Sequence, residues 1–261
     1  MNNNLLLALK NSPFLFLFIA EMLSQVASNM TNFILLLVVF SLTNSNTAVS
    51  GIMLAFLIPA ILLGVLAGVY VDRRDKKYVL TATNIVRGVI LLLLMVFNSS
   101  LISVYLLTFA VAAATQFFIP AETPMIPLLV KKDLLIPANA LFGIAFYGSI
   151  LIAYALSGPF LIYFGTQNAF LILAVMFFAG AVFSSLIKRS SDIKKKSRES
   201  KNLTFASEIK IAMSLIFKIS NIYHSFLMLA LSQILILVIA VIGPGFAKNI
   251  LHIPVNNFPL L

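Results

Sequence analysis

Long apolar stretches separated by short polar turns run along the chain from one end to the other. Backbone groups in lipid find no water to bond, so each stretch must satisfy its own hydrogen bonds as a helix. The stretches reach the ~20 residues that a helix needs to cross a bilayer core of ~30 Å, and they cover 13–40, 48–71, 78–97, 101–120, 138–163, 168–187 and 222–246. The pattern therefore predicts an all-α membrane protein with seven spanning helices.

The composition changes this picture little and excludes several function classes. Of the 261 residues, 61% are hydrophobic and 10% are charged, which leaves too little polar surface for a soluble domain. The formal net charge of +10 resides in loops and not on one broad face, so we expect a lipid bilayer and no nucleic acid as partner. The two histidines have no ligand partners at metal spacing, and no phosphate-binding loop or catalytic triad is present. We therefore expect that the chain binds no metal and no cofactor and is not an enzyme.

The basic residues also predict an orientation. Sixteen of the eighteen lysines and arginines lie at 10, 73–77, 131–132 and 188–218, on one side of the predicted helices. Short basic loops stay on the cytoplasmic side of a membrane. The first apolar stretch has no small-residue cleavage site after it, so we interpret it as a retained helix. We expect a multi-pass protein of the cell inner (cytoplasmic) membrane with a cytoplasmic N-terminus.

The chain changes character between its sixth and seventh apolar stretches. Residues 188–219 are basic and serine-rich, and Phe205, Ile209, Met213 and Ile216 recur there at helical spacing. This pattern is typical of an amphipathic helix on the inner membrane surface, either as a lipid-attracted linker or as a regulatory site. The sequence thus predicts three parts, which are 1–187, 188–219 and 220–261.

A polar stripe follows the first predicted spanning helix. Its members share one helical face at i, i+3, i+4, i+7 and i+11, with one neighbour beside it: Glu21, Ser24, Gln25, Ser28 and Asn32, with Asn29. Such a stripe is costly against lipid, so it must face other helices or water. It either lines a substrate cavity or forms hydrogen bonds that pack the helices together.

Two opposite charges are expected inside the membrane at nearly the same depth. Glu21 lies about eight residues into its helix, ~12 Å from the inner end, and Arg87 lies about nine residues into the third helix. A lone charge there costs ~2.5–3.5 kcal/mol. Glu21 therefore pairs with Arg87, carries a coupling proton, or stands at the wet inner mouth of the cavity. Glu122 is expected in a loop salt bridge with Lys131 or Lys132.

A charged loop follows the second predicted helix. The run Gly68-Val-Tyr-Val-Asp72-Arg73-Arg74-Asp75-Lys76-Lys77 resembles the signature loop between helices two and three of major facilitator superfamily transporters. That signature reads Gly-x-x-x-Asp-Arg/Lys-x-Gly-Arg/Lys-Arg/Lys, and Asp75 stands at its second glycine. The resemblance implies that the loop acts as a conformational latch, in which Asp72 pairs with a helix end of a second bundle. The latch residues are Gly68, Asp72, Arg73, Lys76 and Lys77.

Further stretches are similar to the macrolide and drug efflux branch of that family. They are the proline-rich run 118–130 with 133–141, and Thr83-Asn84-Ile-Val-Arg87-Gly88 with Asn84 where an aspartate is common. Gly158 and Pro159 resemble an antiporter motif of the fifth helix, whose earlier glycines are absent here. The resemblance implies a substrate and proton pathway along Glu21, Gln25, Ser28, Asn29, Asn32, Arg87 and Gln116.

The layout implies the six-helix N-terminal bundle of a major facilitator fold plus one helix of the second bundle. The chain thus resembles a transporter truncated after its seventh helix. The function implied is secondary active transport, with proton-driven efflux of drugs or macrolide-like molecules by alternating access. A facilitator importer of a small metabolite and a membrane-inserted inert fragment are the alternatives. The implied partners are a small-molecule substrate, protons as the coupling ion, and the lipid bilayer.

Overall fold

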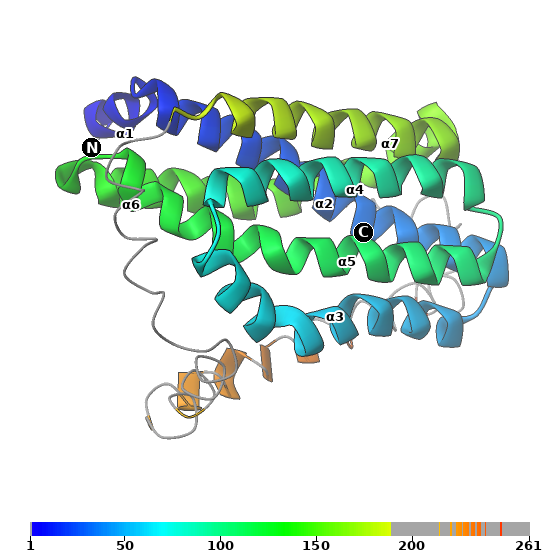
Figure 1. The fold of residues 1–261 in the computed structure, drawn as a ribbon. Coiled ribbons are helices and arrows are strands. Elements are labelled where there is room, and N and C mark those ends of the chain that lie inside the picture. Colours follow the sequence, from blue (N-terminus) through cyan, green and yellow to red (C-terminus); the bar gives the residue numbers. More distant parts are fainter. Residues whose placement is uncertain are drawn as a thin grey trace.

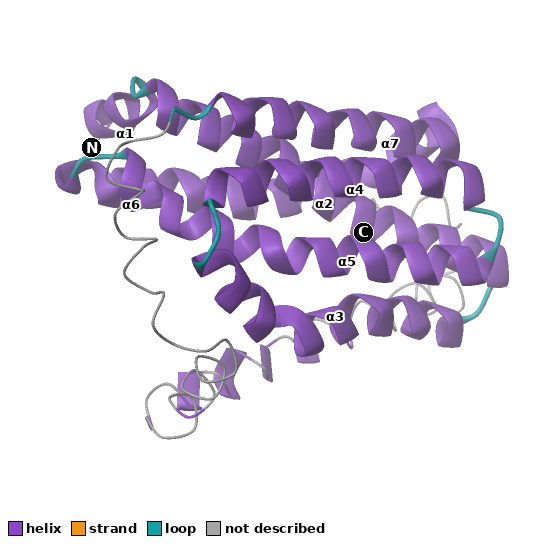
Figure 2. Cartoon of the chain, viewed as in Figure 1, coloured by secondary structure: helices purple, strands orange, loops and turns teal. Residues whose placement is uncertain are grey.

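The computed structural model describes residues 2–188 and scattered positions between 214 and 246. The first of these ranges consists of helices joined by short loops and contains no strand (Figure 2). Its helices are α1 Asn2–Leu9, α2 Ser12–Thr43, α3 Asn46–Asp72, α4 Lys76–Phe97, α5 Leu101–Glu122, α6 Ile126–Leu129 and α7 Leu135–Leu186, with 3₁₀ turns at Thr123–Met125 and Lys132–Leu134. The prediction of an all-α protein is confirmed for this part of the chain.

Helix boundaries follow from local capping chemistry. The hydroxyls of Ser45 and Ser100 accept bonds from Ala48 N and Ser103 N at the starts of α3 and α5. The carboxylate of Asp75 accepts one from Lys77 N at the start of α4, at 3.1 Å. Each cap satisfies a backbone donor that has no partner inside the helix. The helices α3, α4 and α5 therefore begin at the short polar turns of the sequence.

Helix α7 is continuous in hydrogen bonding but contains two spanning segments. Gly165 has φ 70° and ψ 167°, outside the helical region. The segment before it runs parallel to α2, because Asn29 contacts Ser149 and Phe33 contacts Tyr154 farther along both helices. The segment after it runs antiparallel to α2, with Phe16 near Phe183 and Ser24 near Gly180. The two segments thus form a helical hairpin, whose tip lies at the right of Figure 1.

The spanning segments agree with the apolar pattern of the sequence. Within the described residues, five helical elements are long and apolar enough to cross a membrane, and the last of them contains the broken α7. Counting its two segments separately gives the six spans predicted between residues 13 and 187. The predicted seventh span and the amphipathic helix of the linker lie outside the described residues, and the three-part division stays a prediction.

The spans form one bundle with two ends (Figure 1). One end, here named the amino end, holds α1, the α3–α4 loop and α6. The opposite end holds the α2–α3 and α4–α5 turns and the tip of the α7 hairpin. Both α2 and α4 pack extensively against α7, whereas α3 packs mainly on α5. Consequently α3 leaves a row of large apolar side chains exposed, as expected of a helix that meets lipid or another helix: Leu54, Leu57, Ile61, Leu62 and Leu66.

Two apolar clusters fill the bundle, one towards each end. The cluster at the amino end includes Phe14, Leu17, Leu80 and Met125. The larger cluster extends from the middle to the opposite end and includes Ile34, Leu91, Leu94, Val104 and Phe170. Between them lies a layer of buried polar and charged side chains from α2, α4 and α5. This polar layer is the candidate site.

Candidate functional site

The polar stripe of α2 enters the bundle only in part. Glu21 and Ser24 are buried, with 3% and 1% of their surfaces exposed. Ser28 and Asn29 are half-buried, and Asn29 donates to the Ser149 hydroxyl of α7 at 2.8 Å. Asn32 is exposed. The stripe therefore lies only partly inside the bundle, because its first turns are in the polar layer and its last residue is exposed. Gln25, between the two, is half-buried. The bond of Asn29 joins α2 to α7, and the lining of a substrate cavity stays a prediction.

Arg87 on α4 is the centre of the polar layer and is 1% exposed. Its Nη1 donates to Ser28 Oγ at 3.1 Å, and its Nη2 donates to Asn84 Oδ1 at 2.6 Å. Its guanidinium carbon lies 4.2 Å from the ring centroid of Phe118 and 4.6 Å from that of Phe177. A desolvated cation over an aromatic face gains about 2 kcal/mol. Two rings and two acceptors thus hold the guanidinium in place.

Two carboxyl groups face this cation, one more than the sequence predicted. Glu21 and Glu122 are both buried in this layer, and both act electrostatically on the guanidinium of Arg87. Neither makes a direct salt bridge with Arg87 among the described residues. Glu21 Oε2, Glu122 Oε1 and Arg87 Nε are buried and have no hydrogen-bond partner. The predicted Glu21–Arg87 proximity is present as a three-charge cluster and not as a closed ion pair.

The expected loop salt bridge of Glu122 is wrong. Glu122 is the last residue of α5 and is 6% exposed, whereas Lys131 and Lys132 beyond α6 are exposed. The helix continues past Pro120, so Glu122 stays one turn after Phe118 on the same face, and Phe118 covers Arg87. Two residues four apart share a helical face, and this spacing is the signal that would have placed Glu122 inside.

Close helix packing supports the layer from one side. A Cβ on Gly180 of α7 would lie 3.0 Å from Ser24 Oγ, 3.3 Å from Asn84 Nδ2 and 3.4 Å from the Ala20 carbonyl oxygen. Ser24 donates to Asn84 Oδ1 at 2.9 Å, so this oxygen accepts from both Ser24 and Arg87. A side chain here would crowd Ser24 and Asn84, so glycine favours this close approach of α7. The amide at residue 84 thereby connects α2 to the cation.

The charged loop lies at the amino end, away from the polar layer. Asp72 and Arg73 are exposed, and Asp72 lies 3.9 Å from Lys76 Nζ one turn later. Asp75, at the place of the signature glycine, has φ −67° and ψ 112° and caps α4. This extended backbone is open to any residue, and the carboxylate contributes a cap that a glycine lacks. A Cβ on Gly68 would meet no atom within 4 Å, and Lys77 is half-buried.

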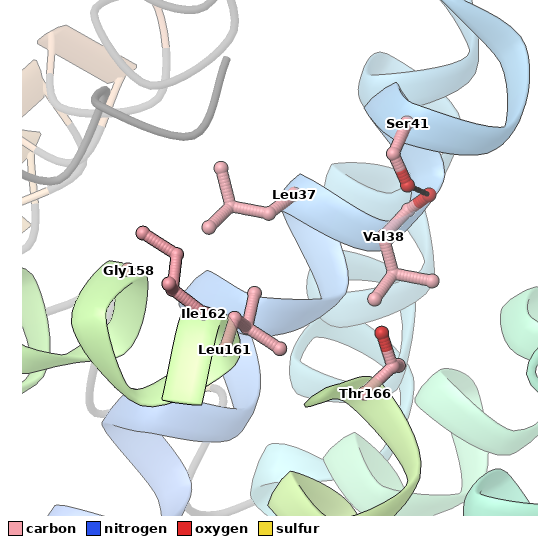
Figure 3. Close-up of a pocket in the computed structure, with 7 residues that line it drawn as sticks. All are labelled: Leu37, Val38, Ser41, Gly158, Leu161, Ile162 and Thr166. Carbon is pink, nitrogen blue, oxygen red and sulfur yellow. Dashed lines mark hydrogen bonds between the residues drawn. The ribbon is translucent and has the colours of Figure 1, made fainter. Parts of the chain in front are cut away.

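The remaining predicted residues lie elsewhere in the bundle. Gln116 is half-buried and donates to the carbonyl of Ala112 on its own helix, at 3.4 Å. Gly158 belongs to a pocket of about 370 Å³ between α2 and α7 near the hairpin tip, shown in Figure 3. The other lining residues are Leu37, Val38, Ser41, Leu161, Ile162 and Thr166. Pro159 lies inside α7 next to this pocket. The structure thus separates the pocket from the charged cluster.

The apolar spans and the buried charged layer define a multi-pass helical membrane protein with ionisable groups in its interior. The family model of the Major Facilitator Superfamily matches residues 17–261, and the chain belongs to this family. The predicted family resemblance is confirmed at this level.

Two relatives come from Bacillus subtilis (strain 168), and both are described as uncharacterized MFS-type transporters. YkuC is 28% identical over 197 residues, which cover 73% of this chain and 44% of the relative. YfiS is 26% identical over 177 residues, which cover 68% of this chain and 42% of the relative. The chain therefore matches less than half the length of either relative. The efflux branch and the truncation stay predictions.

Proposed function

We propose that the chain is the amino-terminal part of a secondary active transporter that exports drugs or macrolide-like molecules in exchange for protons. The observation that carries this proposal is the cluster of Glu21, Glu122 and Arg87 buried between two apolar clusters. Ionisable groups at such a depth are costly and are typical of proton and substrate pathways. Glu21 is the coupling residue in this scheme, with Gln25, Ser28, Asn29, Asn32 and Gln116 along the pathway.

The orientation proposed for this activity places the amino end in the cytoplasm. The basic residues of the range 2–188 lie at that end, apart from Arg87: Lys10, Arg73, Arg74, Lys76, Lys77, Lys131, Lys132 and Lys188. The turns at the opposite end carry no charged residue. This asymmetry favours an inner-membrane protein with a cytoplasmic N-terminus. The charged loop, Gly68 with residues 72–77, then lies where it can act as a latch between inward-open and outward-open states.

Substrate efflux from cells tests the proposal. An efflux-deficient bacterial strain that expresses the transporter containing this chain is loaded with a fluorescent macrolide, and the loss of the macrolide is followed with and without a protonophore. We expect efflux that the protonophore stops, and efflux in Glu21→Gln that no longer responds to the proton gradient. Glu21→Gln mimics a permanently protonated carboxyl, so it removes the proton cycle while leaving the bundle intact.

The matched control is Asp133→Asn, which removes an exposed carboxylate at the amino end and should leave efflux at the wild-type rate. Efflux from the unmodified transporter that is unchanged by the protonophore contradicts proton coupling. Net uptake indicates the facilitator importer, and no movement of substrate by the membrane-inserted transporter indicates the inert fragment. Each of these three results overturns the proposal.

A further inference from the structure

Helix α1 is apolar on both of its faces in its second half, where every residue from Leu5 to Leu9 is apolar. Leu5, Ala8 and Leu9 share one face and belong to the apolar cluster at the amino end or pack against it. Leu6 and Leu7 lie on the other face, with 59% and 46% of their surfaces exposed. A helix that is hydrophobic all round is stable when its surroundings are apolar on every side. The bundle provides such surroundings on one side of α1, and lipid would provide them on the exposed side.

The turn between α1 and α2 fixes the place of α1. Asn11 has φ −77° and ψ 104°, an extended conformation, so α1 is not a continuation of α2. The Nδ2 of Asn11 donates to the carbonyl oxygen of Leu129 on α6 at 2.7 Å. α1 itself contacts α7 and the 3₁₀ turn Lys132–Leu134. These contacts hold α1 at the amino end, beside the segment that joins α6 to α7 (Figure 1).

Exposed lysines surround this part of the bundle, and they are named here the lysine patch: Lys10, Lys131, Lys132 and Lys188. Lys10, Lys131 and Lys188 each directly follow a residue of the amino-end apolar cluster or one packed against it. Lys132 begins the turn that α1 contacts. Asp133 is the one acidic residue beside them, and no salt bridge joins the patch to another described residue. The positive charge of the patch is therefore available to an external anion.

We propose that α1 and the lysine patch form a binding surface for anionic phospholipid at the amino end of the bundle. Leu6 and Leu7 contact the acyl chains, and the lysines reach the phosphate groups on their flexible stems. Apolar side chains next to several lysines fit the boundary between headgroups and acyl chains, whereas a soluble anion would leave both leucines in water. The inference goes beyond the proposed function, because it involves neither a transported substrate nor a coupling ion.

Photocrosslinking in the whole transporter that contains this chain tests the surface. Leu6 is replaced by p-benzoylphenylalanine, and the protein is reconstituted into vesicles of equal parts phosphatidylglycerol and phosphatidylcholine. After illumination, mass spectrometry measures the ratio of the two lipids among the adducts. We expect phosphatidylglycerol to exceed phosphatidylcholine several-fold. A lysine near an anionic surface strengthens binding about fivefold, so Lys131→Gln combined with Lys132→Gln should bring the ratio close to that of the vesicle.

Two controls separate this surface from a general attraction of lipid to the bundle. Arg74→Gln removes a cation from the exposed α3–α4 loop at the same end and should leave the ratio at Leu6 unchanged. The same crosslinker at Ile102, which is 72% exposed at the opposite end, should show no preference for either lipid.

Three results overturn the proposal. Absence of lipid adducts at Leu6 means that protein or water covers the exposed side of α1. Equal adducts of the two lipids mean that the contact is apolar and does not recognise the anionic headgroup. A preference that survives the loss of Lys131 and Lys132 means that it arises outside the lysine patch. The first two results are obtained with all lysines in place, so a lysine variant that fails to insert does not leave the question open.

Discussion

At the scale of the residue, Arg87 shows how a membrane-spanning bundle holds a buried cation without a closed salt bridge. Its guanidinium lies over two aromatic rings and donates hydrogen bonds to two neutral oxygens. Two carboxyls also interact with it electrostatically at longer range. The sequence predicted the depth of Glu21 and Arg87 from their positions in apolar stretches. It missed Glu122, because the nearby prolines suggested a loop and the helix continues through them. Proximity of side chains on different helices depends on packing, which periodicity along one chain does not encode.

The first prediction at this scale compares variants that lose the charge of Glu21 or that of Arg87. Replacing Glu21 by glutamine leaves Arg87 beside Glu122, so the cation is not stranded as it would be in an isolated Glu21–Arg87 pair. Replacing Arg87 by glutamine leaves two carboxyls without a cation and Ser28 without its donor. Removing one partner of a buried charged set costs about 3–5 kcal/mol in soluble proteins. We expect Arg87→Gln to lower the melting temperature in detergent far more than Glu21→Gln does.

The matched control for Arg87→Gln is Arg74→Gln. Arg74 also lies over an aromatic ring, with its guanidinium carbon 5.4 Å from the centroid of Tyr70, but it is exposed. Surface substitutions of this kind change stability by about 0.5 kcal/mol or less. Thermal unfolding followed by intrinsic tyrosine fluorescence would compare the three variants. Equal melting temperatures for the Arg87 and Arg74 variants would show that the buried cluster contributes nothing to stability.

At the scale of the element, the hairpin in α7 depends on a single backbone position. The sequence predicted two spans separated by a polar turn near 165–168. The structure confirms two spans and places the reversal at Gly165, with helical geometry resuming directly after it. Hydropathy indicates where a helix leaves the membrane. The number of residues in the turn depends on dihedral angles, and here one glycine with positive φ is enough.

Gly165→Ala tests this interpretation. A φ of 70° with ψ 167° belongs to a region that is essentially restricted to glycine, and occupying it with another residue costs of the order of 1–3 kcal/mol. The loss should appear as a lower melting temperature and as faster proteolysis at the turn. Steric crowding is not the cause, because a Cβ at this position would meet no atom within 4 Å.

The control for the hairpin is Gly148→Ala, in the same helix. Its added Cβ also meets nothing within 4 Å, and its backbone is helical, so alanine should stabilise it by up to about 1 kcal/mol. Opposite signs for the two substitutions are the expected result. A Gly165→Ala variant as stable as the unmodified chain would mean that the turn relaxes into another geometry at no cost.

At the scale of the whole molecule, charge is sorted between the two ends of the bundle. The basic residues outside the core gather at the amino end, and the opposite end is neutral across residues 2–188. This sorting was readable from the sequence, because it depends only on which loops carry lysine and arginine. The fold class and the six spans followed from the same level of reasoning. Substrate and direction of transport do not, because they depend on cavity surfaces built from several helices.

Reporter fusions measure the proposed orientation. Fusions at Ser45 and Gln167 should be active only with a reporter that works outside the cytoplasm, and fusions at Asp133 and Lys195 only with a cytoplasmic one. The first two positions lie at the neutral end and Asp133 at the basic end, while Lys195 lies outside the described residues. Reversal at any two positions would contradict both the orientation and the arrangement of the spans.

Helix α4 joins two features that are far apart in the molecule. Asp75 caps its first turn at the charged loop, and Arg87 lies twelve residues later, about 18 Å along the same axis. A hydrogen-bonded helix is stiff over this length, so its two ends move together. We therefore expect a tilt of α4 at the charged loop to move the guanidinium of Arg87 relative to the rings of Phe118 and Phe177.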